Sequence, residues 1–205
     1  DIFDVDGRVT ACGSLALQTR ICDRSGTLVR RLMAAGGILL GKTKTVECAL
    51  GGWGTNQRMG TPRNPWDLDT ARVPGGSSAG SGVAVASDLV TCATGTDTGG
   101  SVRLPAAYCG LTGLKVSKNY LPTDGIYPLS HTLDTPGPMA RSVADVALML
   151  AVMRGAEAWA IDQDMKNGQG LFAFQRASVR GLKLGIIDNS ERQVCDADML
   201  KSYDA

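Results

Sequence analysis

The stretch Leu89-Val-Thr-Cys-Ala-Thr-Gly-Thr-Asp-Thr-Gly-Gly-Ser-Val-Arg103 joins a short apolar run to a glycine-rich loop that carries a serine. The run 89–94 has the length and the composition of a buried β-strand, and the loop follows it directly. In α/β folds, binding crevices lie where loops leave the carboxyl ends of strands. The stretch therefore predicts a strand that delivers this loop to a binding site.

Helical and strand-like segments alternate on both sides of this stretch. Residues 25–35 and 141–154 carry apolar residues at helical spacing, and a further helix is expected around 83–86. Short apolar runs predict strands at 38–40 and 182–187. The alternation indicates an α/β fold with a largely parallel or mixed β-sheet covered by helices on both faces.

Composition places the chain among globular proteins that bind small molecules or other proteins. Of its 205 residues, 43% are hydrophobic and 20% are charged, which is enough to form a substantial core. Twenty-one basic and twenty acidic residues leave a net charge of +1, so nothing favours nucleic acid or an anionic membrane as a partner. No apolar run is long enough to cross a membrane, and we expect a cytoplasmic location.

The six cysteines do not suggest a metal site. They form no C-x-x-C pair and no spacing typical of zinc ligands. Free cysteines are most often buried, so we expect reduced thiols in or near the core.

Residues 35–43, AGGILLGKT, fit the pattern of a phosphate-binding loop. Such a loop needs a strand before it and a helix after it, so that main-chain N–H groups face the phosphate. Here the order is reversed, because a predicted helix precedes the pattern and the apolar run 38–40 lies within it. We therefore predict neither nucleotide binding nor a catalytic role for Lys42.

A second motif, Gly76-Ser-Ser-Ala-Gly80, fits the nucleophile elbow of serine hydrolases with Ser78 as nucleophile. That elbow requires a strand immediately before it, whereas residues 70–75 read as a loop. The required histidine could only be His131, which is expected in a surface loop. A triad built on Ser78 is therefore not predicted.

Two glycine-rich serine loops remain, GGSSAGS at 75–81 and TDTGGSVR at 96–103. Glycines beside serines suggest backbone that turns its N–H groups into a pocket. In the second loop, Ser101 could attack a carbonyl carbon, and an oxyanion hole could be formed by the N–H groups of Thr98, Gly99 and Gly100. On spacing alone, two tight turns with serines that cap helices remain an alternative.

A longer ordered series of motifs resembles the amidase signature family. It comprises Arg63-Asn-Pro-Trp66, Pro74-Gly-Gly-Ser-Ser-Ala-Gly-Ser81, Gly95-Thr-Asp-Thr-Gly-Gly-Ser-Val-Arg103, Pro105-Ala-Ala-Tyr-Cys-Gly110, Gly113-Leu-Lys115, Leu133-Asp-Thr-Pro-Gly-Pro138 and Ala140-Arg-Ser-Val143. The resemblance covers nearly the whole chain and implies the amidase signature fold, a mixed sheet between helices. It implies that residues 1–205 are a partial amidase signature domain that lacks its C-terminal part.

The resemblance also implies a Ser-cisSer-Lys mechanism. By motif position Ser101 matches the nucleophile, and Ser77 matches the proton-relaying serine that follows a cis peptide bond. The matching lysine base is expected immediately before Asp1, outside this sequence, and not at Lys42. The segment Ala49-Leu50-Gly51 falls where relatives line the substrate pocket. No metal and no organic cofactor is implied.

The implied activity is hydrolysis of a carboxylic amide C–N bond through an acyl-enzyme on Ser101. An A-type component of a tRNA-dependent amidotransferase is an alternative. Such components typically carry Gln after the Leu-Asp motif, where this chain has Thr135, which favours a free-standing amidase. An inactive fragment or pseudoenzyme that only binds an amide or a partner is an alternative of another class. The expected partner is a small amide, and a homodimer is left open.

Overall fold

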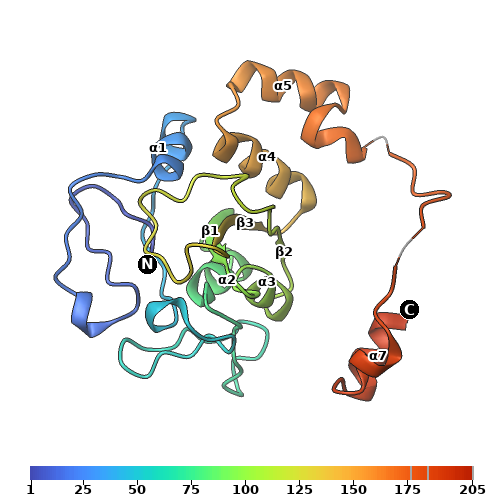
Figure 1. Cartoon of the computed structure of the whole chain (residues 1–205), viewed down its shortest axis with the longest axis horizontal. Helices are drawn as coiled ribbons and strands as arrows, with labels where there is room; N and C mark the ends of the chain where they lie inside the picture. The colour runs from blue at the N-terminus through green and yellow to red at the C-terminus, as the bar shows by residue number, and fades with distance from the viewer. Residues whose placement is uncertain (176, 184, 205) are drawn as a thin grey trace. The chain divides into compact units, whose positions relative to one another are not determined.

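The computed structural model describes residues 1–175, 177–183 and 185–204. The chain divides into a larger unit, residues 1–173, and a smaller unit, residues 174–205 (Figure 1). The larger unit contains both serine loops.

A small sheet lies at the centre of the larger unit. Its strands are β1 (Cys92–Asp97), β2 (Thr112–Gly113) and β3 (Thr135–Ala140), in the order β1-β3-β2. Both pairs are antiparallel, and β3 is buried along its whole length. The expected strand is therefore present, but it begins at Cys92 rather than at Leu89, whose side chain is 69% exposed. The parallel pairs that the alternation suggested are not found among the described strands.

Helices pack on both sides of this sheet, as predicted. The helix α2 (Ala79–Ala86) contacts β1, α3 (Arg103–Tyr108) contacts β2, and α4 (Val143–Arg154) contacts β3. Figure 1 shows α4 on one side of the strands and α2 with α3 on the other. The architecture is therefore α/β, in a partial form.

The helix α4 forms where its sequence pattern places it. The Ser142 hydroxyl caps its N-terminus by accepting a hydrogen bond from the Asp145 N–H at 3.1 Å. Gly155 ends the helix in the left-handed conformation at φ 85°. Its apolar side chains pack against α1 (Thr27–Ala34) and against the N-terminal segment in the main core.

Shorter elements complete the two units. The larger unit holds the 3₁₀ helices η1 (Leu15–Leu17) and η2 (Glu47–Ala49) and the helix α5 (Ala158–Asn167). The 3₁₀ helix η3 (Gly170–Gln175) spans the boundary between the units, and the smaller unit holds α6 (Asn189–Arg192) and α7 (Ala197–Asp204).

The strand predicted at 182–187 is wrong for the residues that the structure describes there. Residues 182, 183 and 185–187 belong to no strand, and residue 184 lies outside the described residues. Leu182 and Ile186 are 64% and 73% exposed, so this apolar run has no sheet to join in the described chain.

The strand predicted at 38–40 is also wrong. Ile38 and Leu40 are 85% and 71% exposed, and the segment is extended without strand pairing among the described residues. It borders an apolar groove of about 650 Å³ lined chiefly by residues 36–45 and 88–96. An apolar run pairs as a strand only when a neighbouring strand is in reach, and in the described chain β1 is paired with β3 alone.

Candidate active site

The two glycine-rich serine loops adjoin each other. The main-chain N–H of Ser78 donates to the carbonyl oxygen of Ser101 at 3.3 Å. The Ser78 hydroxyl also bonds to the main chain of Thr96, accepting from its N–H at 3.2 Å. The structure therefore brings the loops of Ser77 and Ser101 together at the end of β1. Ser78 links them through its hydrogen bonds to the main chain of Ser101 and Thr96.

Ser77 is buried and its hydroxyl is unpaired. The peptide bond between Gly76 and Ser77 is cis, as the resemblance implies. The Ser77 carbonyl accepts hydrogen bonds from the Thr45 hydroxyl at 2.8 Å and the Val46 N–H at 3.1 Å. Ser77 is only 1% exposed, yet its Oγ has no hydrogen-bond partner within the described part of the chain. Buried hydroxyls are normally paired, so the Ser77 hydroxyl is an exception among the described residues.

The segment Ala49-Leu50-Gly51 lies beside the same loop. The Gly76 N–H donates to the Gly52 carbonyl at 2.7 Å. A Cβ atom on Gly76 would stand 2.6 Å from the Gly51 carbonyl oxygen, so only glycine allows this approach. Ala49 is buried and Leu50 is 73% exposed, which leaves the Leu50 side chain accessible next to the serine loops.

The Asp97 carboxylate, fully buried, organises the loop that carries Ser101. It accepts hydrogen bonds from the N–H groups of Gly100 at 2.8 Å, Val102 at 3.2 Å and Arg103 at 3.3 Å. The Arg103 guanidinium adds two further bonds at 3.0 Å. Burial opposes ionisation of Asp97, but the Arg103 side chain and the three N–H groups outweigh it and hold the pKa of this carboxyl below 3.8.

These bonds bear on the predicted oxyanion hole. The Gly100 N–H already donates to Asp97, and the φ angle of Gly100 is 136°, a conformation that favours glycine. Gly99 is exposed and Thr98 is partly exposed. Of the three predicted donors, Gly100 thus contributes to the shape of the loop, whereas Thr98 and Gly99 have no such bond to Asp97.

A second carboxylate, that of Asp134, ties another loop to Thr98. Its Oδ1 accepts a short hydrogen bond from the Thr98 hydroxyl. Its Oδ2 accepts from the N–H groups of Leu129 at 2.9 Å and Ser130 at 3.0 Å. The Lys118 ammonium donates to the Asp134 carbonyl at 3.0 Å. The loop 129–134 is therefore fixed against the end of β1.

Three residues near the serine loops were not predicted as functional from the sequence. Asp97 and Asp134 shape the loops, and the side chain of Leu104 packs over them. The Leu104 side chain would stand 3.0 Å from a Cβ on Gly100 and 3.2 Å from one on Gly52. An aspartate three residues before a glycine in a loop is a known local signal for a side-chain-to-backbone bond and could have indicated Asp97. No comparable local signal exists for Asp134.

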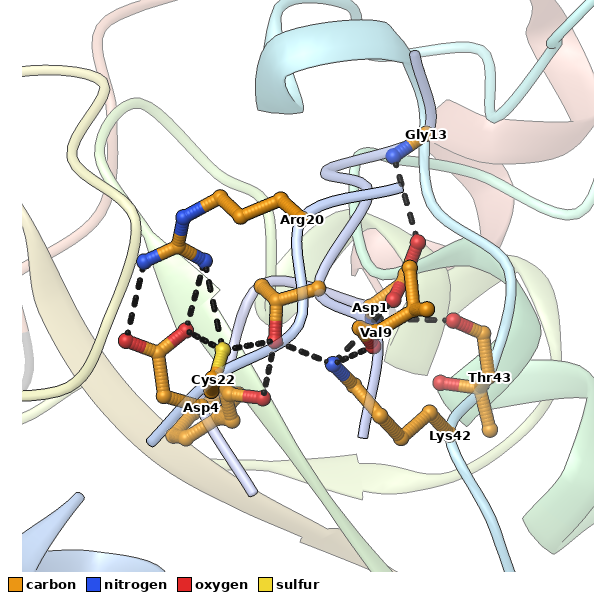
Figure 2. A network of polar contacts seen from close by, with 10 residues as sticks. Asp1, Asp4, Val9, Gly13, Arg20, Cys22, Lys42 and Thr43 are labelled. Atoms are coloured by element: carbon orange, nitrogen blue, oxygen red, sulfur yellow. Dashed lines mark hydrogen bonds and ion pairs between the residues drawn. The ribbon is translucent and has the colours of Figure 1, made fainter. Parts of the chain in front are cut away.

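Lys42 belongs to a separate polar network, which Figure 2 shows. Its ammonium donates to the Val9 carbonyl at 2.6 Å and to the Thr10 hydroxyl, and it pairs with Asp1 Oδ1 at 3.3 Å. Burial lowers the pKa of Lys42. These contacts assign Lys42 to holding the N-terminal segment in place, since the serines Ser77 and Ser101 are not among its partners.

Other candidate features of the sequence lie apart from the two serine loops. His131 is exposed in a loop. Within the described ranges, no group of three or more His, Cys, Asp or Glu side chains could hold a metal ion. In the same part of the chain, no helix is both long and apolar enough to cross a membrane. The 650 Å³ groove includes Ser78 and Ser81 in its lining but neither Ser77 nor Ser101.

Comparison with known proteins identifies the family. The family model for Amidase matches residues 1–205, and the chain therefore belongs to the amidase signature family. The motifs that resembled this family and the joined serine loops thus agree on the class of protein, an enzyme family that acts on C–N bonds.

Curated relatives carry several names. The chain is 45% identical over 186 residues to the A-type component of glutamyl-tRNA(Gln) amidotransferase from Coxiella burnetii (strain Dugway 5J108-111), a match that covers 91% of this chain and 38% of that protein. It is 43% identical over 189 residues to the 2-amino-5-chloromuconic acid deaminase of Comamonas testosteroni, covering 92% of this chain and 38% of the relative. The chain thus spans well under half the length of these relatives.

Solved structures agree with the fold. The native peptide amidase of Stenotrophomonas maltophilia superposes with a TM-score of 0.69 at 39% identity, over 82% of this chain and 35% of that one. The A-type component of glutamyl-tRNA(Gln) amidotransferase from Thermotoga maritima gives a TM-score of 0.70 at 36% identity, over 74% of this chain and 33% of that one.

Proposed function

We propose that the protein containing this chain hydrolyses a carboxylic amide through an acyl-enzyme on Ser101. The observation that carries the proposal is the buried, unpaired hydroxyl of Ser77 in a loop that is hydrogen-bonded to Ser101. A buried hydroxyl without a partner among the described residues suits a proton relay, because no competing hydrogen bond must be broken before it bonds to the base and to Ser101.

The proposed reaction has two stages. A neutral lysine takes the proton of Ser77, Ser77 takes the proton of Ser101, and the Ser101 oxygen attacks the amide carbonyl carbon. The C–N bond then breaks, and the amine leaves with the proton returned through Ser77. Water attacks the ester on Ser101 and releases the acid, which restores the free hydroxyl.

The lysine of this scheme is proposed at the position immediately before Asp1. The main-chain nitrogen of Asp1 donates to the Thr43 carbonyl at 2.9 Å. Two residues further along, the Thr45 hydroxyl donates to the Ser77 carbonyl at 2.8 Å. The main chain at Asp1 and the Ser77 loop thus bond to the same short segment, residues 43–45, which supports the proposed position of the lysine.

The rest of the site is proposed to bind the substrate. The N–H groups of Thr98 and Gly99 would stabilise the negative charge on the carbonyl oxygen in the tetrahedral intermediate, with Gly100 fixing the turn. The exposed Leu50 side chain and the adjoining Ala49 and Gly51 would contact the acyl part of the amide.

The test is amide hydrolysis by the purified protein with whatever flanking sequence its gene encodes. Ser101→Ala should abolish release of ammonia or amine from simple carboxylic amides. The matched control is Ser87→Ala, the same change at an exposed serine that follows α2, and it should leave the rate unchanged. Equal rates in the two variants would contradict the proposal, and absence of turnover in the unaltered protein would favour a binding role instead.

A second candidate function is that of one component of an amidotransferase, favoured by the 45% identity to the relative in Coxiella burnetii. It predicts that glutamine is a better amide donor than simple alkyl amides and that hydrolysis rises when the partner components are added. A free-standing amidase predicts turnover of simple amides by the purified protein, with its encoded flanking sequence, in the absence of any partner component.

A further inference from the structure

Cys12 and Cys48 lie opposite each other on two loops of the larger unit. The Cys48 N–H donates to the Cys12 carbonyl at an N···O distance of 2.8 Å. With standard backbone dimensions, this bond keeps the two Cα atoms within about 7 Å of each other. That separation is the upper limit at which two cysteines can form a disulfide without backbone movement, about 7 Å.

The pKa of the Cys12 thiol is consistent with this proximity. Both thiols are free in the structure. Burial, and to a smaller extent the neighbouring Cys48 thiol, raises the pKa of the Cys12 thiol to about 12. The geometric evidence for the pair is the backbone hydrogen bond between the two loops.

The backbone fixes both cysteines in unusual conformations. Their φ angles are 53° at Cys12 and 51° at Cys48, in the left-handed region that residues other than glycine seldom adopt. The Cys12 N–H donates to the Asp1 carbonyl at 3.0 Å, and the Ala49 N–H that follows Cys48 donates to the Val46 carbonyl at 2.9 Å. Hydrogen bonds on both loops thus hold the main chain of Cys12 and Cys48 in these positions.

The two cysteines differ in exposure. Cys12 is fully buried, whereas Cys48 is exposed. An accessible thiol beside a second, resolving thiol is the arrangement of cysteines that are oxidised reversibly. The proposed hydrolysis uses neither thiol.

We propose that Cys12 and Cys48 form a reversible intramolecular disulfide when the protein meets a hydroperoxide. The thiolate sulfur of Cys48 attacks the terminal oxygen of the hydroperoxide, the O–O bond breaks, and Cys48 becomes a sulfenic acid while the alkoxide leaves, which is hydroxide when the oxidant is hydrogen peroxide. The Cys12 sulfur then attacks the Cys48 sulfur, its proton and the hydroxyl group of the sulfenic acid leave together as water, and the S–S bond forms. The two thiols lose two electrons, which the peroxide gains, and a dithiol reductant restores both thiols.

Two buried cysteines provide an internal comparison. The Cys22 thiol donates to Asp4 Oδ1 at 3.1 Å and to the Thr10 hydroxyl at 3.2 Å. The Cys109 thiol donates to the Pro74 carbonyl at 3.4 Å. In the part of the chain that the structure describes, no thiol is among these acceptors, so both cysteines should stay reduced.

The experiment is a mass map of the purified protein, which needs no assay of hydrolysis. The protein is treated with hydrogen peroxide, free thiols are alkylated under denaturing conditions, and the digest is analysed before and after dithiothreitol. We expect a linked pair of peptides that contain Cys12 and Cys48, lighter by two hydrogens than the two peptides together and lost on reduction. Cys22 and Cys109 should be recovered alkylated.

Substitutions sharpen the test. Cys48→Ser changes an exposed side chain, so the fold should be kept, and Cys12 should then be recovered alkylated after peroxide. Cys22→Ser should leave the link between Cys12 and Cys48 intact. Recovery of Cys48 as sulfinic or sulfonic acid with Cys12 alkylated, or a link between Cys48 residues of two chains, would overturn the proposal.

Discussion

Replacing Asp97 by Asn should destabilise the fold and disable the serine loop together. The carboxylate accepts two bonds at Oδ1, from Gly100 and Arg103, and three at Oδ2, from Val102 and from the main chain and side chain of Arg103. An amide has one oxygen, so at least one buried main-chain N–H must face an NH₂ group. The Arg103 side chain is 54% exposed and can bind water instead, so losing its bonds to Asp97 should lower the free energy of unfolding less than losing a bond from a buried N–H.

The expected magnitude follows from these bonds. An orphaned buried donor costs about 1–3 kcal/mol, and breaking a fully buried ion pair costs about 3–5 kcal/mol. Because only one partner here is buried, we expect Asp97→Asn to lower the free energy of unfolding by about 2–4 kcal/mol. Displacement of the Gly100 turn should also lower amide hydrolysis, on the order of 100-fold, in the fraction that remains folded.

The assay is urea denaturation monitored by tryptophan fluorescence, and amide hydrolysis is measured separately in buffer without urea. Asp124→Asn is the matched control, since the Asp124 carboxylate accepts from the Thr27 N–H at 3.0 Å and the Thr27 hydroxyl at 2.8 Å at the start of α1. It should cost about 1 kcal/mol and leave hydrolysis unchanged. A change below about 0.5 kcal/mol for Asp97→Asn, the range typical of surface substitutions, would refute this reasoning.

Three further predictions concern Ser77, Lys42 and pH. Ser77→Ala should lower hydrolysis by orders of magnitude while the free energy of unfolding, measured in urea, stays equal or rises, because a buried hydroxyl without a described partner is removed; a loss of stability would contradict this. Lys42→Met should lower the free energy of unfolding by about 1–3 kcal/mol, because the Thr10 hydroxyl and the Asp1 carboxylate lose a buried cation, yet change hydrolysis little; loss of activity in folded protein would point to Lys42 as the base. Stability should fall in acid, because the pKa of Asp97 in the folded state is held below its ordinary value of 3.8. The contribution of Asp97 to the free energy of unfolding is present above pH 3.8 and is lost as the pH falls through the folded pKa. Urea titrations at several pH values should show this loss in the unaltered protein and not in Asp97→Asn.

Local patterns in the sequence predicted the elements that depend on local chemistry. The helix α4 follows from apolar periodicity with Ser142 before it and Gly155 after it. The loop that carries Ser101 follows from glycines directly after an apolar run. In both cases, the interactions that decide the structure join residues only a few positions apart, so the sequence pattern contains them.

The errors arose where a partner lies far away in the chain. An apolar run at 38–40 becomes a strand only when its main chain pairs with another strand, and its exposed side chains show that this run is not packed into the sheet. Likewise, the tie between Asp134 and Thr98 joins segments that no motif connects. The juxtaposition of Cys12 and Cys48 could not be read from spacing either, because two loops meet there only in the folded chain.

The most direct test of the proposed roles of Ser101 and Ser77 is covalent labelling of the purified protein with a fluorophosphonate, a probe that reacts with activated serines. We expect one adduct, located at Ser101 by peptide mapping, which disappears in Ser101→Ala and forms much more slowly in Ser77→Ala. No adduct on folded protein, or an adduct at Ser78 in place of Ser101, would contradict these roles.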